Sequence, residues 1–116
     1  MLVSQITELL DAKIHCGEAY LDQVVSSGCG CDMMSDALAF MKDQAVLMTG
    51  LINPQVIRTA EMMDAVCVVF VRGKEPTPAM IELASQHALV VLSTHYRLFQ
   101  ACGILYGAGL DGGGKI

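Results

Sequence analysis

Polar residues suited to binding a small anion follow three short apolar runs in the second half of the chain. Guanidinium, ammonium, hydroxyl and backbone N–H groups all bind phosphate or carboxylate, and arginine does so with two parallel hydrogen bonds. Helix starts also favour negative charge, since their first N–H groups have no partner within the helix. The sequence therefore predicts this ligand-binding set: Thr49, Gly50, Asn53, Arg58, Arg72, Gly73, Lys74, Thr94 and His95.

The elements that must position these residues are the three apolar runs, residues 45–48, 65–71 and 88–92. None of the runs alternates apolar with polar residues, so each is typical of a strand buried on both faces. Such strands form parallel sheets, in which ligands bind at the carboxyl ends of the strands. We therefore expect the three polar segments to lie along one edge of a sheet and to form a pocket for a small anionic ligand or a nucleotide.

A purely structural role for the same residues is the alternative. Hydroxyl and amide side chains commonly cap helices, and the candidates for this role are Asn53, Thr77 and Thr94. Arg58 and Arg72 would then pair with acids such as Glu61 or Asp64. The sequence leaves both interpretations open.

Helices are expected to alternate with these strands. Asn53-Pro54 and Thr77-Pro78 each combine a capping residue with a proline at the first helical position. Apolar periodicity predicts further helices within residues 1–10, 35–42 and 96–106, and short strands at 12–16 and 22–26. Residues 26–32, which contain Gly28 and Gly30, are expected to form a loop. One α/β domain is predicted over residues 1–110, with residues 111–116 as a flexible tail.

Cysteine and histidine spacing gives little support for a metal site. Cys29-Gly-Cys31 supplies two thiols as weak candidate ligands, to which Cys16 or His15 would add others. Structural metal sites usually contain two spaced pairs, and the second pair is missing here, although two subunits pooling their ligands would supply it. We expect neither a metal nor another cofactor.

Catalytic motifs are also missing. His15, His87 and His95 have no partner at a spacing typical of acid–base or nucleophilic catalysis. Asp32 and Asp36 lie four residues apart at a predicted helix start, where acids favour the positive end of the helix dipole. We interpret them as a cap and a solvated face, and we expect the chain not to be an enzyme.

Charge and composition exclude several classes of partner. Lysine and arginine total seven against twelve acidic residues, so the net charge is −5, whereas nucleic-acid binding needs a basic surface. The longest apolar stretch, residues 65–71, is far shorter than the roughly 20 residues that span a bilayer. We expect neither nucleic acid nor a membrane as a partner. The first residues lack the features of a signal peptide, so a cytoplasmic location with reduced cysteines is expected.

The apolar content predicts a subunit interface. Hydrophobic residues make up 53% of the chain, above the roughly 45–50% of typical soluble domains. Met33-Met34 and Met62-Met63 are pairs of neighbours. A helix cannot turn both members of such a pair fully into one core. A homodimer is the simplest way to cover the excess apolar surface.

Several blocks of the sequence resemble one known family. The blocks are Val46–Arg58, Val68–Pro76, Val90–Phe99 and the short stretch Ser35–Ala39. On these residues the chain resembles a stand-alone DRTGG domain over nearly its whole length. The motifs that name the family are replaced here, since Leu51-Ile52 stands in place of the Asp-Arg pair and Val71-Arg72-Gly73 in place of Thr-Gly-Gly.

The resemblance implies a fold and a role. The fold is the three-layer α/β/α arrangement of the N-terminal domain of HPr kinase/phosphorylase, with a mainly parallel sheet of about four to five strands. DRTGG domains occur beside CBS domains and, as stand-alone forms, near genes of iron–hydrogenases and iron–sulfur electron-transfer proteins. The implied role is accessory or regulatory, without catalysis. No P-loop motif is present, so phosphoryl transfer is not implied.

We therefore expect a non-catalytic regulatory or ligand-sensing domain that acts on a redox or metabolic enzyme. The alternative is a protein-interaction module of a hydrogenase or electron-transfer complex that binds no small molecule. A third hypothesis is a metal or iron–sulfur protein that uses Cys29 and Cys31.

Overall fold

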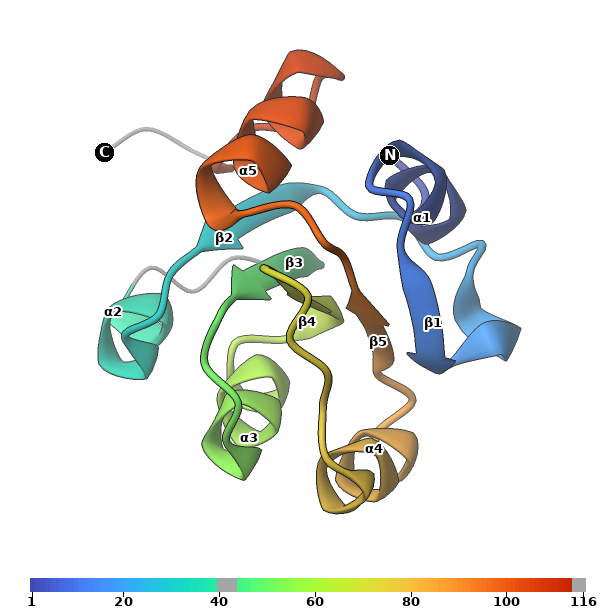
Figure 1. Cartoon of the computed structure of the whole chain (residues 1–116), viewed down its shortest axis with the longest axis vertical. Coiled ribbons are helices and arrows are strands. Elements are labelled where there is room, and N and C mark those ends of the chain that lie inside the picture. The colour runs from blue at the N-terminus through green and yellow to red at the C-terminus, as the bar shows by residue number, and fades with distance from the viewer. Residues whose placement is uncertain (40–43, 114–116) are drawn as a thin grey trace.

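The computed structural model describes residues 1–39 and 44–113, which form a single five-stranded sheet covered by helices on both faces (Figure 1). Its elements, in chain order, are α1 (Val3–Leu9), β1 (Lys13–Cys16), the short 3-10 helix η1 (Glu18–Tyr20), β2 (Ser27–Gly30), α2 (Met34–Ala39), β3 (Ala45–Thr49), α3 (Pro54–Met62), β4 (Ala65–Phe70), α4 (Pro78–Ser85), β5 (Val90–Ser93) and α5 (Leu98–Gly107).

The strands lie in the order β1-β5-β4-β3-β2. The four strands β2 to β5 run parallel, whereas β1 pairs with β5 in the antiparallel direction. The expected α/β/α fold with a mainly parallel sheet is therefore confirmed. The three apolar runs also end at one edge, because β3, β4 and β5 are adjacent and parallel.

Alternate residues of the central strands enter two separate cores. Leu47, Phe70 and Val91 face α2, α3 and α4, while Met48 and Leu92 face α1 and α5. All five side chains are almost completely buried. This is why the runs show no polar alternation: a strand with helices on both sides has no solvent face.

The two Asn/Thr-Pro sequences begin helices as expected. The Asn53 side chain accepts a hydrogen bond from the Gln55 N–H at 2.8 Å, and Thr77 Oγ1 accepts one from the Met80 N–H at 3.3 Å. Pro54 and Pro78 occupy the first helical positions, where no N–H is needed. Both helices consequently start at the same edge of the sheet as the ends of β3 and β4.

One strand was assigned to the wrong residues. Strand β2 covers Ser27–Gly30, within the predicted loop, and not residues 22–26. Apart from a bridge between Leu2 and Val24, residues 22–26 lie outside the sheet. A Cβ on Gly30 would lie 2.5 Å from Cys102 Sγ of α5, and a Cβ on Gly28 would lie 3.3 Å from Leu110, just after α5. The strand contains glycines because they leave space for the neighbouring helix. Glycine has a low strand propensity, so the sequence alone suggested a loop here.

Each methionine pair divides between the core and the surface. Met34 and Met63 are buried, whereas Met33 and Met62 are more than half exposed. Among the described residues, no helix is long and apolar enough to cross a membrane. The last residue of the predicted domain, Leu110, is buried, and the carbonyl of Asp111, the first residue of the predicted tail, accepts a hydrogen bond from Gly28 N–H. The prediction for the last residues, 114–116, lies outside the described residues, as does the end of the helix expected at 35–42.

Candidate functional site

The end of β3 is tied to the end of β2 by the carboxylate of Asp32. Its Oδ1 accepts hydrogen bonds from Thr49 Oγ1 at 3.0 Å and from the Gly50 N–H at 2.8 Å. Thr49 Oγ1 in turn accepts the Leu51 N–H at 3.1 Å. Thr49 and Gly50 were predicted to bind an external anion, but the chain supplies a carboxylate to both donors itself. Asp32 was interpreted as a helix cap, and its observed role is different.

Arg72 lies across Gly50 at the middle of this edge. A Cβ on Gly50 would lie 2.7 Å from an Arg72 guanidinium nitrogen, so any side chain at position 50 would force the guanidinium to move. Arg72 has a left-handed backbone (φ 62°), which is unusual for a residue with a side chain. Two hydrogen bonds between backbones hold it: the Arg72 N–H donates to Tyr96 O and the Gly73 N–H to Thr94 O. The loops that follow β4 and β5 are therefore joined at this point.

The end of β5 directs its polar side chains in different directions. Thr94 Oγ1 donates a hydrogen bond of 2.6 Å to the Leu10 carbonyl at the end of α1, and it is buried. His95 is exposed, with its ring 4.4 Å from the ring of Tyr96. Thr94 thus anchors α1, while His95 faces solvent. Thr94 does not cap α5, because Arg97 occupies that position.

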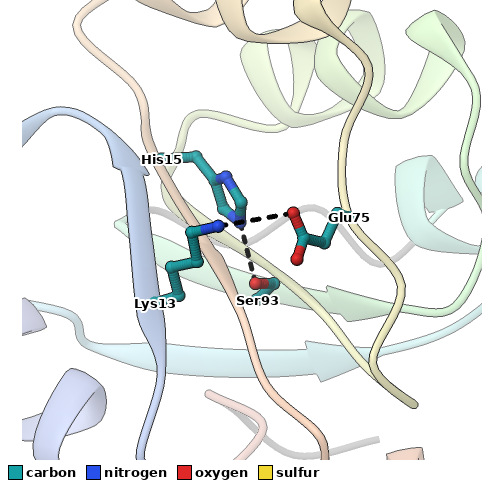
Figure 2. Close-up of polar contacts among 4 residues, drawn as sticks. All are labelled: Lys13, His15, Glu75 and Ser93. Carbon is teal, nitrogen blue, oxygen red and sulfur yellow. Dashed lines mark hydrogen bonds and ion pairs between the residues drawn. The ribbon is translucent and has the colours of Figure 1, made fainter.

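A second polar cluster lies where β1 meets β5 at the same edge (Figure 2). His15 Nε2 and Ser93 Oγ are 2.8 Å apart, and Lys13 Nζ lies 3.5 Å from Glu75 Oε1. Burial and the nearby Lys13 ammonium lower the pKa of His15, and Glu75 partly opposes them. Lys13 and Glu75 are exposed, whereas Ser93 is 7% exposed. The cluster therefore combines a buried hydroxyl, a half-buried imidazole and an ion pair at the surface.

Asn53 and Arg58 do not join the residues around Arg72. Asn53 caps α3, and Arg58 lines a separate groove of about 340 Å³ between α3 and α4, together with Glu82. Lys74 is exposed in the loop that also carries Arg72, on the other side of Gly73. The predicted set is thus divided between the sheet edge and the outer surface of the helices.

The cysteines form no recognisable metal site. Cys31 Sγ contacts the Met33 backbone, 3.1 Å from its carbonyl oxygen, and Cys29 is half-buried in β2. Burial raises the pKa of the Cys29 and Cys102 thiols, which disfavours the thiolate that a metal requires. No group of three or more potential ligands occurs within residues 1–39 and 44–113.

A groove of about 840 Å³ lies at the opposite edge of the sheet, between the end of α5 and α1. Its walls include Leu9, Val24 and Gly109, and Glu8 supplies negative charge. This groove contains none of the predicted ligand-binding residues. Arg72 and Lys74 therefore lie at the edge opposite to this groove.

Sequence reasoning missed Asp32, Lys13, His15, Glu75 and Ser93 as a group. Asp32 was missed because β2 was assigned to the wrong residues. With β2 placed correctly, an acid just after a parallel strand is expected at the ligand-binding edge. Lys13 and His15 required the antiparallel pairing that sets Lys13 opposite Ser93. Residues two positions apart on a strand share a face, which would have linked Lys13 with His15.

Comparisons with known proteins agree with this fold. Residues 5–107 match the family model of the DRTGG domain. A similar solved structure contains the CBS and DRTGG domains of the regulatory region of Clostridium perfringens pyrophosphatase, in complex with the activator diadenosine tetraphosphate. The TM-score is 0.70 at 16% sequence identity, and the alignment covers 90% of the present chain but only 45% of the other. No curated protein matches the chain. Because the family model spans most of its length, the chain belongs to the DRTGG domain family.

Proposed function

We propose that this DRTGG domain is a non-catalytic sensor that binds a small anionic ligand, of the nucleotide class, at the carboxyl edge of its sheet. The observation that supports this most directly is the placement of Arg72. A side chain in a left-handed backbone conformation costs free energy, and such residues are often found at ligand-binding sites.

The charge on Arg72 supports an external anion as its partner. Within the part of the chain that the structure describes, the ion pairs are Lys13 with Glu75 and His87 with Glu61. Arg72 therefore forms no ion pair there, and Glu61, one of the acids expected to neutralise it, pairs with a histidine. An exposed guanidinium on a backbone that is fixed by hydrogen bonds is suited to binding a phosphate with two parallel hydrogen bonds.

Asp32 suggests how the rest of a nucleotide would be oriented. Its Oδ1 already accepts two hydrogen bonds, whereas Oδ2 accepts none from the described residues. A carboxylate oxygen at the ends of parallel strands is a good acceptor for a sugar hydroxyl or a base amino group. We propose that phosphate contacts Arg72 and Lys74, while a neutral donor group of the ligand contacts Asp32.

The comparison supports a regulatory role for the same fold. The pyrophosphatase region named above is regulatory and was crystallised with a nucleotide activator, diadenosine tetraphosphate. By analogy, we propose that ligand binding here changes the activity of another enzyme, of redox or other metabolism. We further propose a cytoplasmic homodimer, because all five cysteines are free thiols and apolar side chains remain exposed on α5.

Calorimetric titration with AMP and ATP tests this proposal. We expect binding by the wild-type chain and at least a tenfold loss of affinity in Arg72→Ala, because a hydrogen bond to a charged group commonly contributes that much. Gly50→Ala should weaken binding as well, since the new methyl group displaces the guanidinium. Arg58→Ala is the matched control, and its affinity should equal that of the wild type. Equal affinities in all four proteins would contradict the assignment of the site.

The exposed aromatic residues of α5 favour a second candidate function, docking on a protein partner. Phe99 is 85% exposed and Tyr106 is 72% exposed, seven residues apart on one helix. Under this hypothesis the domain binds a hydrogenase or electron-transfer subunit without a small molecule. Co-purification with such a subunit that is lost in Phe99→Ser but unchanged in Arg72→Ala would favour docking over sensing.

A further inference from the structure

Three polar side chains converge at the junction of β1 and β5, apart from the residues around Arg72. Antiparallel pairing sets Lys13 opposite Ser93, and His15 lies two residues further along β1 on the same side (Figure 2). The imidazole reaches the serine hydroxyl at 2.8 Å. An ammonium, an imidazole and a hydroxyl brought together from two strands are a chemistry that binds phosphate oxygens.

An acid of the chain already lies against this group. The Glu75 carboxylate is 3.5 Å from the Lys13 ammonium, and both side chains are more than half exposed. Such a pair contributes little to stability, because solvent screens it. Glu75 belongs to the loop between β4 and α4 that also carries Arg72. The Glu75 carboxylate is thus held loosely, and an external anion would compete with it for the Lys13 ammonium.

We propose that Lys13, His15 and Ser93 form a second anion subsite, which binds a further phosphate of the same ligand after Glu75 is displaced from Lys13. This inference rests on the proposed function, since it assumes that the first phosphate binds at Arg72. It adds a preference: the ligand carries several phosphates in a chain.

The spacing of the strands supports that preference. Ser93 is in register with Phe70, and Phe70 with Thr49, the residue before Gly50. The Arg72 guanidinium lies at Gly50, so it is about two strand spacings away from Ser93. Neighbouring strands lie about 4.8 Å apart, which makes the separation about 10 Å. One phosphate group is too small to contact both subsites. A monophosphate would use the Arg72 subsite alone, whereas a triphosphate has the length to reach Lys13.

Protonation of His15 links the second subsite to pH. The charged groups that act on His15 are Lys13, which lowers its pKa together with burial, and Glu75, which raises it. A phosphate that replaces Glu75 brings more negative charge and favours the imidazolium. Triphosphate binding should therefore take up a proton near neutral pH, and it should tighten as the pH falls toward 6.

The decisive experiment compares ATP with AMP by titration calorimetry on the full chain. We expect ATP to bind about tenfold or more tightly in the wild type. Lys13→Met and His15→Gln should each reduce the ratio of the two affinities to about threefold or less, without changing the affinity for AMP. Glu75→Gln should tighten ATP binding severalfold, because it removes the competing charge. Arg72→Ala should weaken both ligands.

Matched controls separate the two proposals. His87→Gln removes a histidine that also pairs with a glutamate, Glu61, but on the helical surface, so it should leave the ratio unchanged. An unchanged ratio in both Lys13→Met and His15→Gln overturns the second subsite, while a loss in Arg72→Ala still supports the first. If neither nucleotide binds, the proposed function fails, and inorganic tripolyphosphate becomes the probe. Its binding must then depend on Lys13, and no binding overturns the subsite as well.

Discussion

The two ends of the sheet differ in how their loops are held together. At the carboxyl edge, hydrogen bonds join one loop to the next: Asp32 joins β2 to β3, and Gly73 joins the loops after β4 and β5. At the amino edge, a groove of about 840 Å³ separates α1 from the end of α5, and Val24 beside it is 50% exposed. Arg72, Lys74 and the Lys13–Glu75 pair lie at the first edge, whereas the groove at the second edge has Glu8 among mostly apolar side chains.

In the two proposed functions, one fold uses two different surfaces for recognition. A small charged ligand needs donors held at fixed positions, which the cross-linked edge supplies. A protein or another copy of the chain needs apolar surface, and the α5 side of the molecule offers it. The same parallel topology produces both, because α3, α4 and α5 start at one end of β3, β4 and β5 and end at the other.

The largest expected effect comes from breaking the packing beneath the carboxyl edge. Phe70 is fully buried between Thr49 and Ser93 in the register of the sheet. Phe70→Ala should lower the free energy of unfolding by about 3–5 kcal/mol, through lost burial and an unfilled cavity. Val24→Ala at the amino edge should change it by less than about 0.5 kcal/mol. Urea denaturation measures both, and similar losses would refute the contrast between the edges.

Asp32→Ala should have the next largest effect. The substitution leaves the buried Thr49 hydroxyl and the Gly50 N–H without their acceptor, which costs about 1–3 kcal/mol. Asp22→Ala, an exposed acid outside the sheet, serves as control and should stay within about 0.5 kcal/mol of the wild type. Thermal unfolding of the two variants checks this, and a stable Asp32→Ala would mean that water replaces the carboxylate readily.

Arg72→Gly should separate stability from binding. Glycine adopts the left-handed conformation without steric cost, so the free energy of unfolding should rise by up to about 1 kcal/mol while nucleotide affinity falls. Asp64 is also left-handed (φ 59°), but it lies between α3 and β4 at the amino edge. Asp64→Gly should show the same gain in stability with unchanged affinity. Loss of binding in both variants would indicate a general loosening of the fold.

The smallest effect is a pH dependence that arises from His15. Its pKa in the folded state is lowered from 6.5, so between these two values the unfolded chain binds more protons. The folded state therefore gains stability as the pH rises through this window and loses it as the pH falls. His15→Gln should flatten the urea-unfolding profile there, whereas His87→Gln should retain the slope. Proton NMR of the imidazole measures the pKa directly, and a value above 6.5 would reverse the sign.

Much of the fold was predictable, because strong local signals agreed with it. Continuous apolar runs predicted β3, β4 and β5, and Asn53-Pro54 predicted the start of α3, since both signals depend on nearby residues alone. Strand β2 was missed because residues Ser27–Gly30 form a strand only by pairing with β3 and packing under α5. Local residue propensities do not encode these contacts.

The candidate site was less predictable than the fold. The sequence predicted that Arg72 and Gly73 lie at the carboxyl edge of the sheet, because a residue that directly follows a parallel strand must lie there. Side-chain direction was not predictable: Thr94 turns toward Leu10 on the α1 side, and Arg58 lies on the outer surface of the helices. The contact between His15 and Ser93 joins residues 78 apart in sequence, and it depends on a strand direction that the pattern does not reveal.

The two outer strands have a consequence for how copies of this chain behave at high concentration. Both β1 and β2 have only four residues; β1 has an irregular register between Ile14 and Cys16, and the outer side of β2 is partly taken up by the Asp111 carbonyl. Short, interrupted margins are poor templates for strands from other molecules, which protects the chain from amyloid-like stacking. Self-association by strand pairing is therefore disfavoured at both margins of the sheet.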